Sequence, residues 1–412
     1  MTRLLLACSL VALVGAAPAV AQPWFRDASA THLPPKGALP NNTMDVEAAD
    51  IDGDGDLDLV TAQEWLLNTV LINDGKGVFT DGSSRLPPLS ADETKGGPPL
   101  PGHDSEDVSI ADFDGDGVLD LLIVSEDDIR LGRTPTHEYY RGAGGGRFER
   151  VPGRIPDTEA DAVAHGDVDG DGRLDLLLTG AGQDRLLIGD GKGGFRDDTD
   201  TRLPREAATG QDGIFVDIDG DRDLDIVLGM EGGHALWIND GKGRFGDDTA
   251  GRLPVAGFVE ARKVEPGDVD GDGDVDLYFS HVGWQGKAPA DALLLNDGRG
   301  RFTRAGADRL PADAETTLDG RLADLDGDGD LDLVRVNMGP LQILENDGRG
   351  RFRDVTAEAL PAPVAGPGVA VEIADLDGDG VLDLYVGMLA GGGPQPNPDA
   401  HDRLLLGVRR GG

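Results

Sequence analysis

A nine-residue acidic motif occurs seven times along the chain and is the pattern best suited to chemistry. Its form is D-h-D-G-D-x-x-h-D, where h is apolar, and successive copies start 50 to 62 residues apart. Aspartates at positions 1, 3, 5 and 9, with the backbone carbonyl of position 7, bring hard oxygen ligands to one side of a tight loop. Such a donor set predicts Ca²⁺ sites. Mg²⁺ is the second choice because it demands stricter octahedral geometry.

The predicted ligands are the residues at positions 1, 3, 5, 7 and 9 of each copy, which allows up to seven Ca²⁺ ions. They are Asp50, Asp52, Asp54, Asp56 and Asp58; Asp112, Asp114, Asp116, Val118 and Asp120; Asp167, Asp169, Asp171, Arg173 and Asp175; Asp217, Asp219, Asp221, Asp223 and Asp225; Asp268, Asp270, Asp272, Asp274 and Asp276; Asp324, Asp326, Asp328, Asp330 and Asp332; and Asp375, Asp377, Asp379, Val381 and Asp383. Position 6 is glycine, which turns at positive φ without strain, except for Arg222 in the fourth copy. We therefore expect the site at Asp217 to be distorted or empty.

The residues around each motif indicate the elements that must hold it. An apolar run such as LDLV follows the loop, as in a buried strand, and a second signature such as VLINDGKGVF predicts a hairpin. Each repeat thus supplies about four strands, and four-stranded repeats of this length are typical of propeller blades. The prediction is an all-β, seven-bladed β-propeller with four-stranded blades.

The two chain ends complement each other. The last repeat stops without its outer strand, while the segment WFRDASATHLP at 24–34 matches FRDVTAEALP at 352–361. The N-terminal strand is therefore predicted to complete the last blade, which closes the ring and removes two exposed strand edges.

Composition sets limits on the class of protein. The 63 glycines and 25 prolines in 412 residues exclude a mainly helical protein. The net charge of −40 excludes nucleic acid as a partner, because phosphate binding requires clustered Lys and Arg. No segment is long and apolar enough to be a transmembrane helix.

The first 21 residues have the pattern of a secretory signal peptide. Arg3 precedes an apolar stretch, and Ala19-Val20-Ala21 provides a small-residue cleavage site. Residues 1–21 are thus predicted to be removed near Gln22, leaving 22–412 as one propeller that is secreted or periplasmic, with association at the cell surface as an alternative. Lipidation at Cys8, which lies in a lipoprotein-like box, is a minor alternative because the apolar region before it is short.

Both signatures, and the way they alternate, resemble the FG-GAP or VCBS repeat family of calcium-containing propellers, which includes the integrin α-subunit head. The resemblance covers roughly residues 22–408. It implies that Asp50, Asp52, Asp54 and Asp58, with their equivalents in other blades, are side-chain calcium ligands. Members of the family serve as adhesion modules, sugar-binding modules or parts of enzymes, so the resemblance names no single activity.

The metal loops and the hairpin turns are expected on one rim of the ring, which leaves a chemically different opposite rim. The predicted ligand-binding residues on that rim are Trp65, His103, His137, His234, His281, Trp284 and His401. Acids five or six residues before the metal motifs are expected to start the innermost strands and to ring the channel mouth there; they are Asp45, Glu106, Asp107, Asp161, Asp212 and Asp319. The alternative is that the histidines and tryptophans only cover strand ends.

Function is predicted as a binding or adhesion module for a glycan or protein ligand, and the chain is expected to be a monomer. No serine-nucleophile elbow, zinc-protease helix motif or phosphate loop occurs in the sequence, so no catalytic residue is assigned. The alternative is a calcium-dependent polysaccharide lyase or hydrolase that uses the histidine-rich rim. A single enzyme candidate, His103 among the carboxylates of 104–107, is first interpreted as part of a polar loop.

Overall fold

The computed structural model describes residues 22–39, 41–91, 93–94, 101–205, 209–254, 259–283, 290–312, 316–389 and 400–409. The predicted signal peptide at 1–21 and the candidate ligand residue Trp284 lie outside these ranges.

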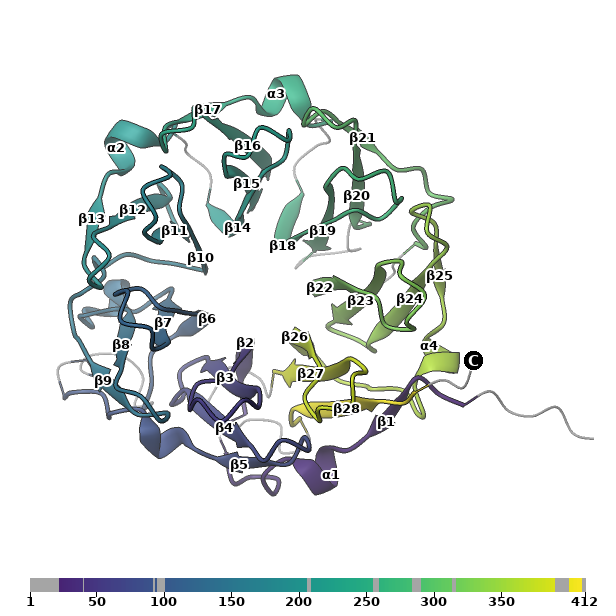
Figure 1. Ribbon diagram of the computed structural model, residues 1–412, viewed down its shortest axis with the longest axis horizontal. Helices are drawn as coiled ribbons and strands as arrows, with labels where there is room; N and C mark the ends of the chain where they lie inside the picture. The colour runs from purple at the N-terminus through teal and green to yellow at the C-terminus, as the bar shows by residue number, and fades with distance from the viewer. Residues whose placement is uncertain are drawn as a thin grey trace, which may run out of the picture.

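The described chain forms seven antiparallel four-stranded sheets arranged as blades around a central opening (Figure 1). The innermost strands are β2 (Thr43–Ala49), β6 (Ser105–Ala111), β10 (Ala162–Gly166), β14 (Gly210–Val216), β18 (Glu260–Gly267), β22 (Thr317–Ala323) and β26 (Gly368–Ala374). The second strands are β3 (Asp58–Gln63), β7 (Asp120–Ser125), β11 (Asp175–Thr179), β15 (Asp225–Met230), β19 (Asp276–Val282), β23 (Asp332–Asn337) and β27 (Asp383–Met388).

The outer half of each blade is a pair of antiparallel strands, which is a hairpin in six blades and comes from the two ends of the chain in the last. Its third strands are β4 (Thr69–Asn73), β8 (Glu138–Gly142), β12 (Arg185–Gly189), β16 (Gly233–Asn239), β20 (Ala292–Asn296), β24 (Gln342–Asn346) and β28 (Arg403–Gly407). Its outer strands are β5 (Phe79–Asp81), β9 (Phe148–Arg150), β13 (Phe195–Asp197), β17 (Phe245–Asp247), β21 (Phe302–Arg304), β25 (Phe352–Asp354) and β1 (Phe25–Asp27). The seven-bladed, four-stranded propeller predicted from the repeats is confirmed.

The hydrophobic core lies between adjacent blades. Every residue of a typical second strand, such as β3 or β27, is buried because both faces of the sheet pack against a neighbour. In one such cluster Leu59 and Leu71 of the first blade pack on Tyr385 and Leu404 of the last. Fully burying a leucine side chain stabilises a fold by about 1.5–3 kcal/mol, so each interface holds its two blades in a fixed relation.

The N-terminal strand closes the ring as predicted. Strand β1 pairs antiparallel with β28, with Phe25 opposite Gly407. The backbone N–H of Val408 also donates to the carbonyl of Trp24 at 2.7 Å, and Trp24 is buried. Both ends of the described chain are therefore held in one blade, and the outer edge of β28 is covered.

Short helices follow the outer strands and were not predicted. They are α1 (Ser29–His32), α2 (Thr199–Arg202), α3 (Thr249–Arg252) and α4 (Thr356–Ala359), and the 3₁₀ turn η1 (Ser83–Arg85) takes the same place after β5. A further 3₁₀ turn, η2 (Ile129–Leu131), follows the second strand β7. An aspartate at the end of the outer strand starts the turn: the Thr199 N–H donates to Asp197 Oδ1 at 3.0 Å. Four residues cannot carry a helical period in the sequence, so this turn chemistry was the only available signal.

Candidate metal loops and channel mouth

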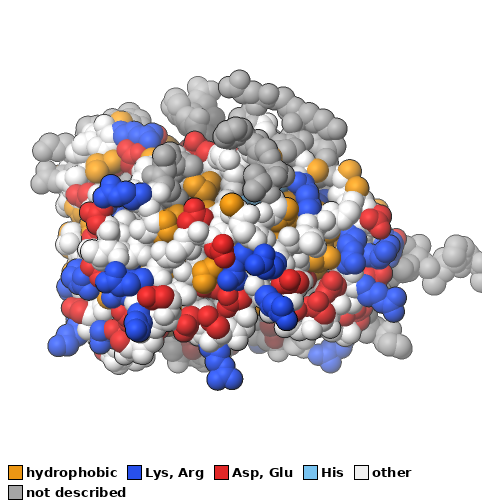
Figure 2. Space-filling view, turned by 90° about the horizontal axis from the view of Figure 1, so that it is seen from above, with side chains coloured by type: hydrophobic (Ala, Val, Ile, Leu, Met, Phe, Trp, Pro, Cys, Tyr) orange, Lys and Arg blue, Asp and Glu red, His pale blue; other side chains and the backbone are white. Residues whose placement is uncertain are grey.

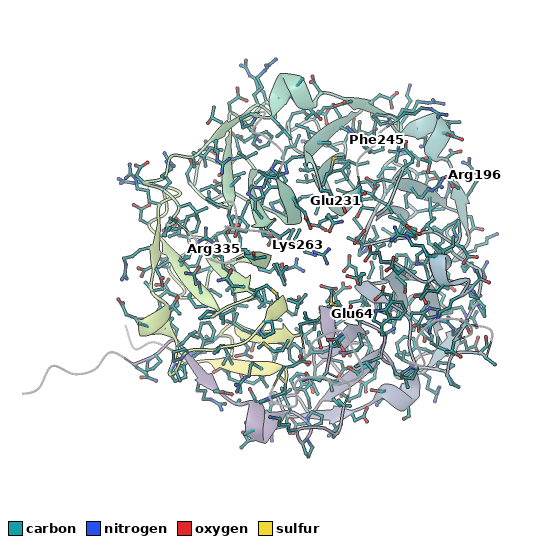
Figure 3. All side chains as sticks on the ribbon, turned by 180° about the vertical axis from the view of Figure 1, so that it is seen from behind. Glu64, Arg196, Glu231, Phe245, Lys263 and Arg335 are labelled. Atoms are coloured by element: carbon teal, nitrogen blue, oxygen red, sulfur yellow. The ribbon has the colours of Figure 1, made fainter. Side chains whose placement is uncertain are left out.

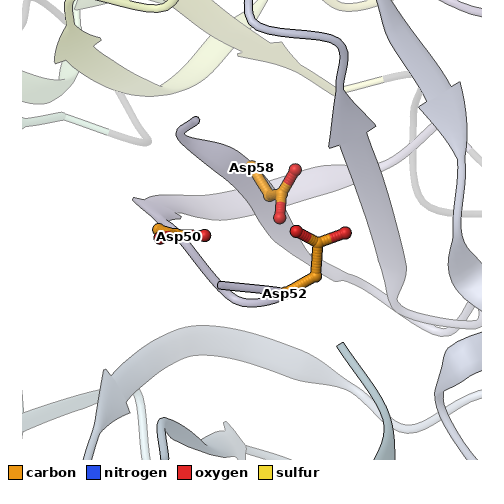
Figure 4. Close-up of side chains that lie close together, drawn as sticks. All are labelled: Asp50, Asp52 and Asp58. Atoms are coloured by element: carbon orange, nitrogen blue, oxygen red, sulfur yellow. The ribbon is translucent and has the colours of Figure 1, made fainter. Parts of the chain in front are cut away.

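The aspartates of each acidic motif come together in the loop between the first two strands of a blade. In the first blade one carboxylate oxygen from each of Asp50, Asp52 and Asp58 lies within 4.8 Å of the others (Figure 4). The same spacing holds for the matching residues of two more blades: Asp112, Asp114 and Asp120; and Asp167, Asp169 and Asp175. In the fourth blade it holds for Asp217, Asp219 and Asp221, where the position 5 aspartate takes the place of the position 9 one. Two oxygens on opposite sides of a Ca²⁺ ion are about 4.6–5.2 Å apart, so these groups have the right size.

The carboxylate at position 1 organises the loop backbone. Asp50 Oδ1 accepts the N–H groups of Gly53 at 2.8 Å and Asp54 at 3.1 Å, and Oδ2 accepts that of Gly55 at 3.0 Å. Gly55 has φ = 97°, a conformation that side chains with a Cβ resist. The motif thus curls around its own first residue, which is why nine adjacent residues suffice to build the loop.

The carboxylate at position 3 has one oxygen held and one free. Asp52 Oδ2 lies 3.3 Å from an Arg85 nitrogen, while Asp52 Oδ1 is buried without a hydrogen-bond donor. The same orphaned Oδ1 occurs in Asp169, Asp219 and Asp270, whose Oδ2 atoms face arginines. A buried, unsatisfied carboxylate oxygen is costly unless a cation meets it, so the donor set fits the predicted Ca²⁺.

The carboxylate at position 9 joins the metal loop to the outer hairpin. Asp58 Oδ1 accepts the N–H of Asn73 at 2.8 Å, while Asp58 Oδ2 is buried without a donor. Burial raises the pKa of Asp58 to about 6, against the lowering effect of that hydrogen bond. The position therefore has both a structural role and an oxygen available for a metal.

The fourth loop keeps its backbone form despite Arg222. Arg222 adopts φ = 76°, and its N–H still donates to Asp217 Oδ2 at 3.0 Å, as glycine does in the other loops. The hydrogen bonds to Asp217 hold a left-handed arginine in place, so the backbone keeps its form, and the expectation of a distorted or empty metal site at Asp217 stays a prediction. The loop instead stores strain, since a side chain in this region costs roughly 1–2 kcal/mol.

Neighbouring blades are linked at this metal-loop rim by residues that the sequence analysis did not single out. The Asn239 side-chain amide donates to the carbonyl of Val168, in the metal loop of the preceding blade, at 2.9 Å. Arg252 contacts Asp219 Oδ2 of its own blade and donates to the Arg299 carbonyl of the next. The recurrence of Asn-Asp-Gly and Arg-Leu-Pro in the repeats was the signal that could have identified both.

The candidate ligand residues of the opposite rim fall into three separate groups. The Trp65 N–H donates to the His103 carbonyl at 2.7 Å, and His137 lies in the same region, with its Nδ1 3.2 Å from the Ser125 N–H nitrogen. His234 and His281 stack with their Nε2 atoms 3.3 Å apart. His401 lines a cavity elsewhere, beside β1 and β28.

Most of these histidines are covered by protein. His103, His137 and His281 are 0%, 3% and 1% exposed. Burial lowers the pKa of His137 and of His234 to about 3, with His103 and His281 respectively adding to the effect. His103 also lies against Asp128, with Nδ1 3.1 Å from Oδ2. Rings placed this way cover strand ends, and their part in ligand binding stays a prediction.

The channel mouth is the set of charged residues at the start of the innermost strands: Asp45, Glu106, Asp107, Asp161, Asp212 and Asp319, as predicted, together with Arg262 and Lys263. In six blades the innermost strand has a register shift here, as between Ser105 and Asp107. The bulge leaves Glu106 as an extra residue, so adjacent acids both line the mouth.

The sequence analysis did not predict the basic residues of the channel mouth, Arg262 and Lys263. Arg262 and Lys263 stand six and five residues before Asp268, at the repeat positions that carry acids elsewhere. Lys263 Nζ lies 3.8 Å from Asp212, and Figure 3 shows it at the central opening between Glu64 and Glu231. Burial opposes the charge of Lys263, yet Asp212 and its neighbours raise its pKa above the ordinary value. An alignment of the repeats would have shown that basic residues replace acids at these two positions of the fifth repeat.

The side wall of the ring differs from the channel mouth. Acidic and basic side chains lie side by side over the face seen in Figure 2. Arg202, for example, contacts both Asp169 and Asp198 within 3.0 Å. Much of the negative charge is therefore paired or gathered in loops, while acids crowd together at the mouth.

Comparisons with known proteins agree with this architecture. A model of the FG-GAP-like repeat matches residues 167–228, 217–279 and 324–386. No curated protein sequence matches the chain. Within the described residues, none of the helices has the length and apolar character needed to cross a membrane.

Two solved structures share the fold at low identity. The BBS1N structure, determined in complex with ARL6DN, is 11% identical over 95% of this chain and 99% of that one, with a TM-score of 0.54. The extracellular domain of the putative one component system BT4673 from B. thetaiotaomicron is 14% identical over 90% of this chain and 40% of that one, with a TM-score of 0.50. Three FG-GAP-like repeats in the sequence and seven four-stranded blades in the structure support an FG-GAP repeat β-propeller family for this chain.

Proposed function

We propose that the protein is an exported, calcium-stabilised propeller that acts as a binding module, with a glycan or protein ligand docking at the channel mouth. The observation that carries the proposal is the convergence of charged side chains from six blades on one opening of a rigid ring. Ligands are commonly bound by groups that a rigid scaffold holds at its loops and strand ends.

Calcium belongs to the scaffold in this proposal. The orphaned Oδ1 atoms of Asp52, Asp169, Asp219 and Asp270 support metal binding in the loops, on the rim away from the channel mouth. A bound ion there would neutralise the carboxylates and hold the loop, and the hairpin that contacts it, in the folded form.

The solved neighbours support the same class of function. One is the extracellular domain of a putative one component system, and the other was determined in complex with a second protein. Both facts favour recognition over catalysis, and export agrees with the signal-peptide pattern of residues 1–21.

The test is a glycan array and a protein-binding screen with the purified protein, run beside a turnover assay on anionic polysaccharides. We expect saturable binding without product, and product formation would overturn the proposal.

Charge reversals locate the surface. Glu64 and Glu231 flank the channel mouth, where they interact electrostatically with Arg262 and Asp161 respectively (Figure 3). Glu64→Lys and Glu231→Lys therefore reverse charges at its edge, whereas Arg196→Glu, on the outer strand β13, is the matched control. Binding to the identified ligand should fall at least tenfold in one of the first two variants and stay unchanged in the control. Equal affinity in all three variants would remove the channel mouth as the docking surface.

A further inference from the structure

A second carboxylate cluster lies on the opposite rim, far from the nine-residue motifs. One oxygen from each of Asp104, Glu106 and Glu126 lies within 4.8 Å of the others. Asp104 and Glu106 lie at the start of β6, and Glu126 directly follows the end of β7. The Glu126 N–H donates to the Asp104 carbonyl at 3.1 Å. Glu106 is the extra residue at the bulge between Ser105 and Asp107.

Asp104 is the unusual member of the cluster. Asp104 is only 4% exposed, and its Oδ1 is buried without any hydrogen-bond donor. Burial raises the pKa of Asp104 to about 8, and the neighbouring charges that add to this effect are all acids: Glu64, Glu126, Asp128 and Asp127. A buried carboxylate in acidic surroundings needs either a proton or a cation.

The nearby arginines are engaged with other partners. Arg133 pairs with Asp128, and Arg130 pairs with Asp127 and Glu159. Arg262 reaches Glu106 at 3.4 Å from the channel side and also faces Asp161. One arginine charge plus one divalent ion would balance the three carboxylates of the cluster.

We infer that Asp104, Glu106 and Glu126 form a divalent-cation site distinct from the seven repeat loops. Oxygens within 4.8 Å of one another fit around one Ca²⁺ ion, whose ligands stand at 2.3–2.6 Å. An ion of this size takes six to eight oxygens, so three carboxylates leave coordination positions for water or for an oxygen of a bound ligand. Mn²⁺ accepts the same donors and serves as a probe.

The test is anomalous diffraction from crystals of the full chain soaked in MnCl₂. We expect a manganese peak among the three carboxylates, and its loss in Asp104→Asn crystals that keep the peaks of the repeat loops. Peaks in the loops with none at Asp104 in the unaltered protein would overturn the inference.

Thermal melts provide a second readout that does not depend on crystals. Asp104→Asn should not lower the melting temperature in EDTA, because the amide replaces a buried carboxyl whose Oδ1 has no hydrogen-bond donor, and it should reduce the rise produced by calcium by about 2 °C. Glu126→Gln, at a half-buried position, should reduce that rise in the same way. Glu231→Gln, an exposed acid of the same rim, is the control and should change neither value. A calcium-induced rise as large in both cluster variants as in the unaltered protein would contradict the site.

Discussion

The two rims of the ring are both acidic, but they are built in different ways. At the metal-loop rim every ligand set comes from nine adjacent residues, and the position 1 carboxylate folds the loop around itself. At the channel mouth the acids come from different blades, up to 274 residues apart between Asp45 and Asp319. The first kind of site is local and repeats, whereas the second exists only once the ring has closed.

The difference also appears in how charge is compensated. Four of the metal loops leave a position 3 oxygen for a cation, as Asp52 Oδ1 shows, while the channel mouth has its own cations in Arg262 and Lys263. Removing metal should therefore affect the first rim, and removing a basic side chain should affect the second.

The largest expected effect is that of chelation on the metal-loop rim. A site filled at a free Ca²⁺ concentration ten times its dissociation constant adds about 1.4 kcal/mol to the free energy of unfolding. Seven such sites together would stabilise the protein by on the order of 10 kcal/mol. We expect EDTA to lower the melting temperature by more than 10 °C and added calcium to restore it. An unchanged melting temperature would contradict calcium binding in the loops.

The next effect is the pH dependence of the metal-free protein. Burial raises the pKa of Asp58 and Asp175 to about 6 and that of Asp225, Asp276 and Asp332 to about 7, from 3.8. Between pH 4 and pH 7 the folded state then binds more protons than the unfolded state, so stability falls as pH rises through this window. In EDTA the melting temperature should be several degrees lower at pH 8 than at pH 5.

Calcium should remove this trend, because the ion competes with the proton for the same oxygens. The measurement is a pair of melting curves at each pH, with EDTA and with excess calcium. A metal-free protein that becomes more stable from pH 5 to pH 8 would contradict the assignment of these buried aspartates.

A smaller effect is expected from removing a cation of the channel mouth. Lys263→Met leaves the buried Asp212 without the ammonium group 3.8 Å away and should lower the free energy of unfolding by about 2–3 kcal/mol. The matched control is Lys192→Met, an exposed lysine in the hairpin turn of the third blade, which should change it by less than about 0.5 kcal/mol. Chemical unfolding in calcium measures both, and equal values would show that Lys263 is not needed to offset the acids.

The smallest effect concerns the fourth loop. Arg222→Gly relieves a left-handed side chain at φ = 76° and should raise the free energy of unfolding by about 0.5–1 kcal/mol, since the chain-entropy cost of glycine offsets part of the gain. The reciprocal variant is Gly172→Arg at the same position of the third loop, where φ is 83° and no atom lies within 4 Å of an added Cβ. It should destabilise by a similar amount, and a neutral result in both variants would show that the loop position is not strained.

Much of the fold followed from features that repeat along the chain. The period of the acidic motif fixed the number of blades, the hairpin signature supplied the outer strands, and the match between 24–34 and 352–361 predicted ring closure by β1. The short turns such as α2 were not predicted because four residues are too few to carry a helical period.

The sequence by itself determined the metal loops, because a loop that folds around Asp50 uses only contacts within six residues. Only the tertiary structure decided what surrounds the channel. Which histidines are buried, and which acids meet Arg262 or lie beside Asp104, depends on contacts between blades and on strand bulges. The contact of Arg262 with Glu106 joins residues that are distant in sequence and depends on the closed ring, whereas the group around Asp104 depends on the pairing and bulge of β6 and β7.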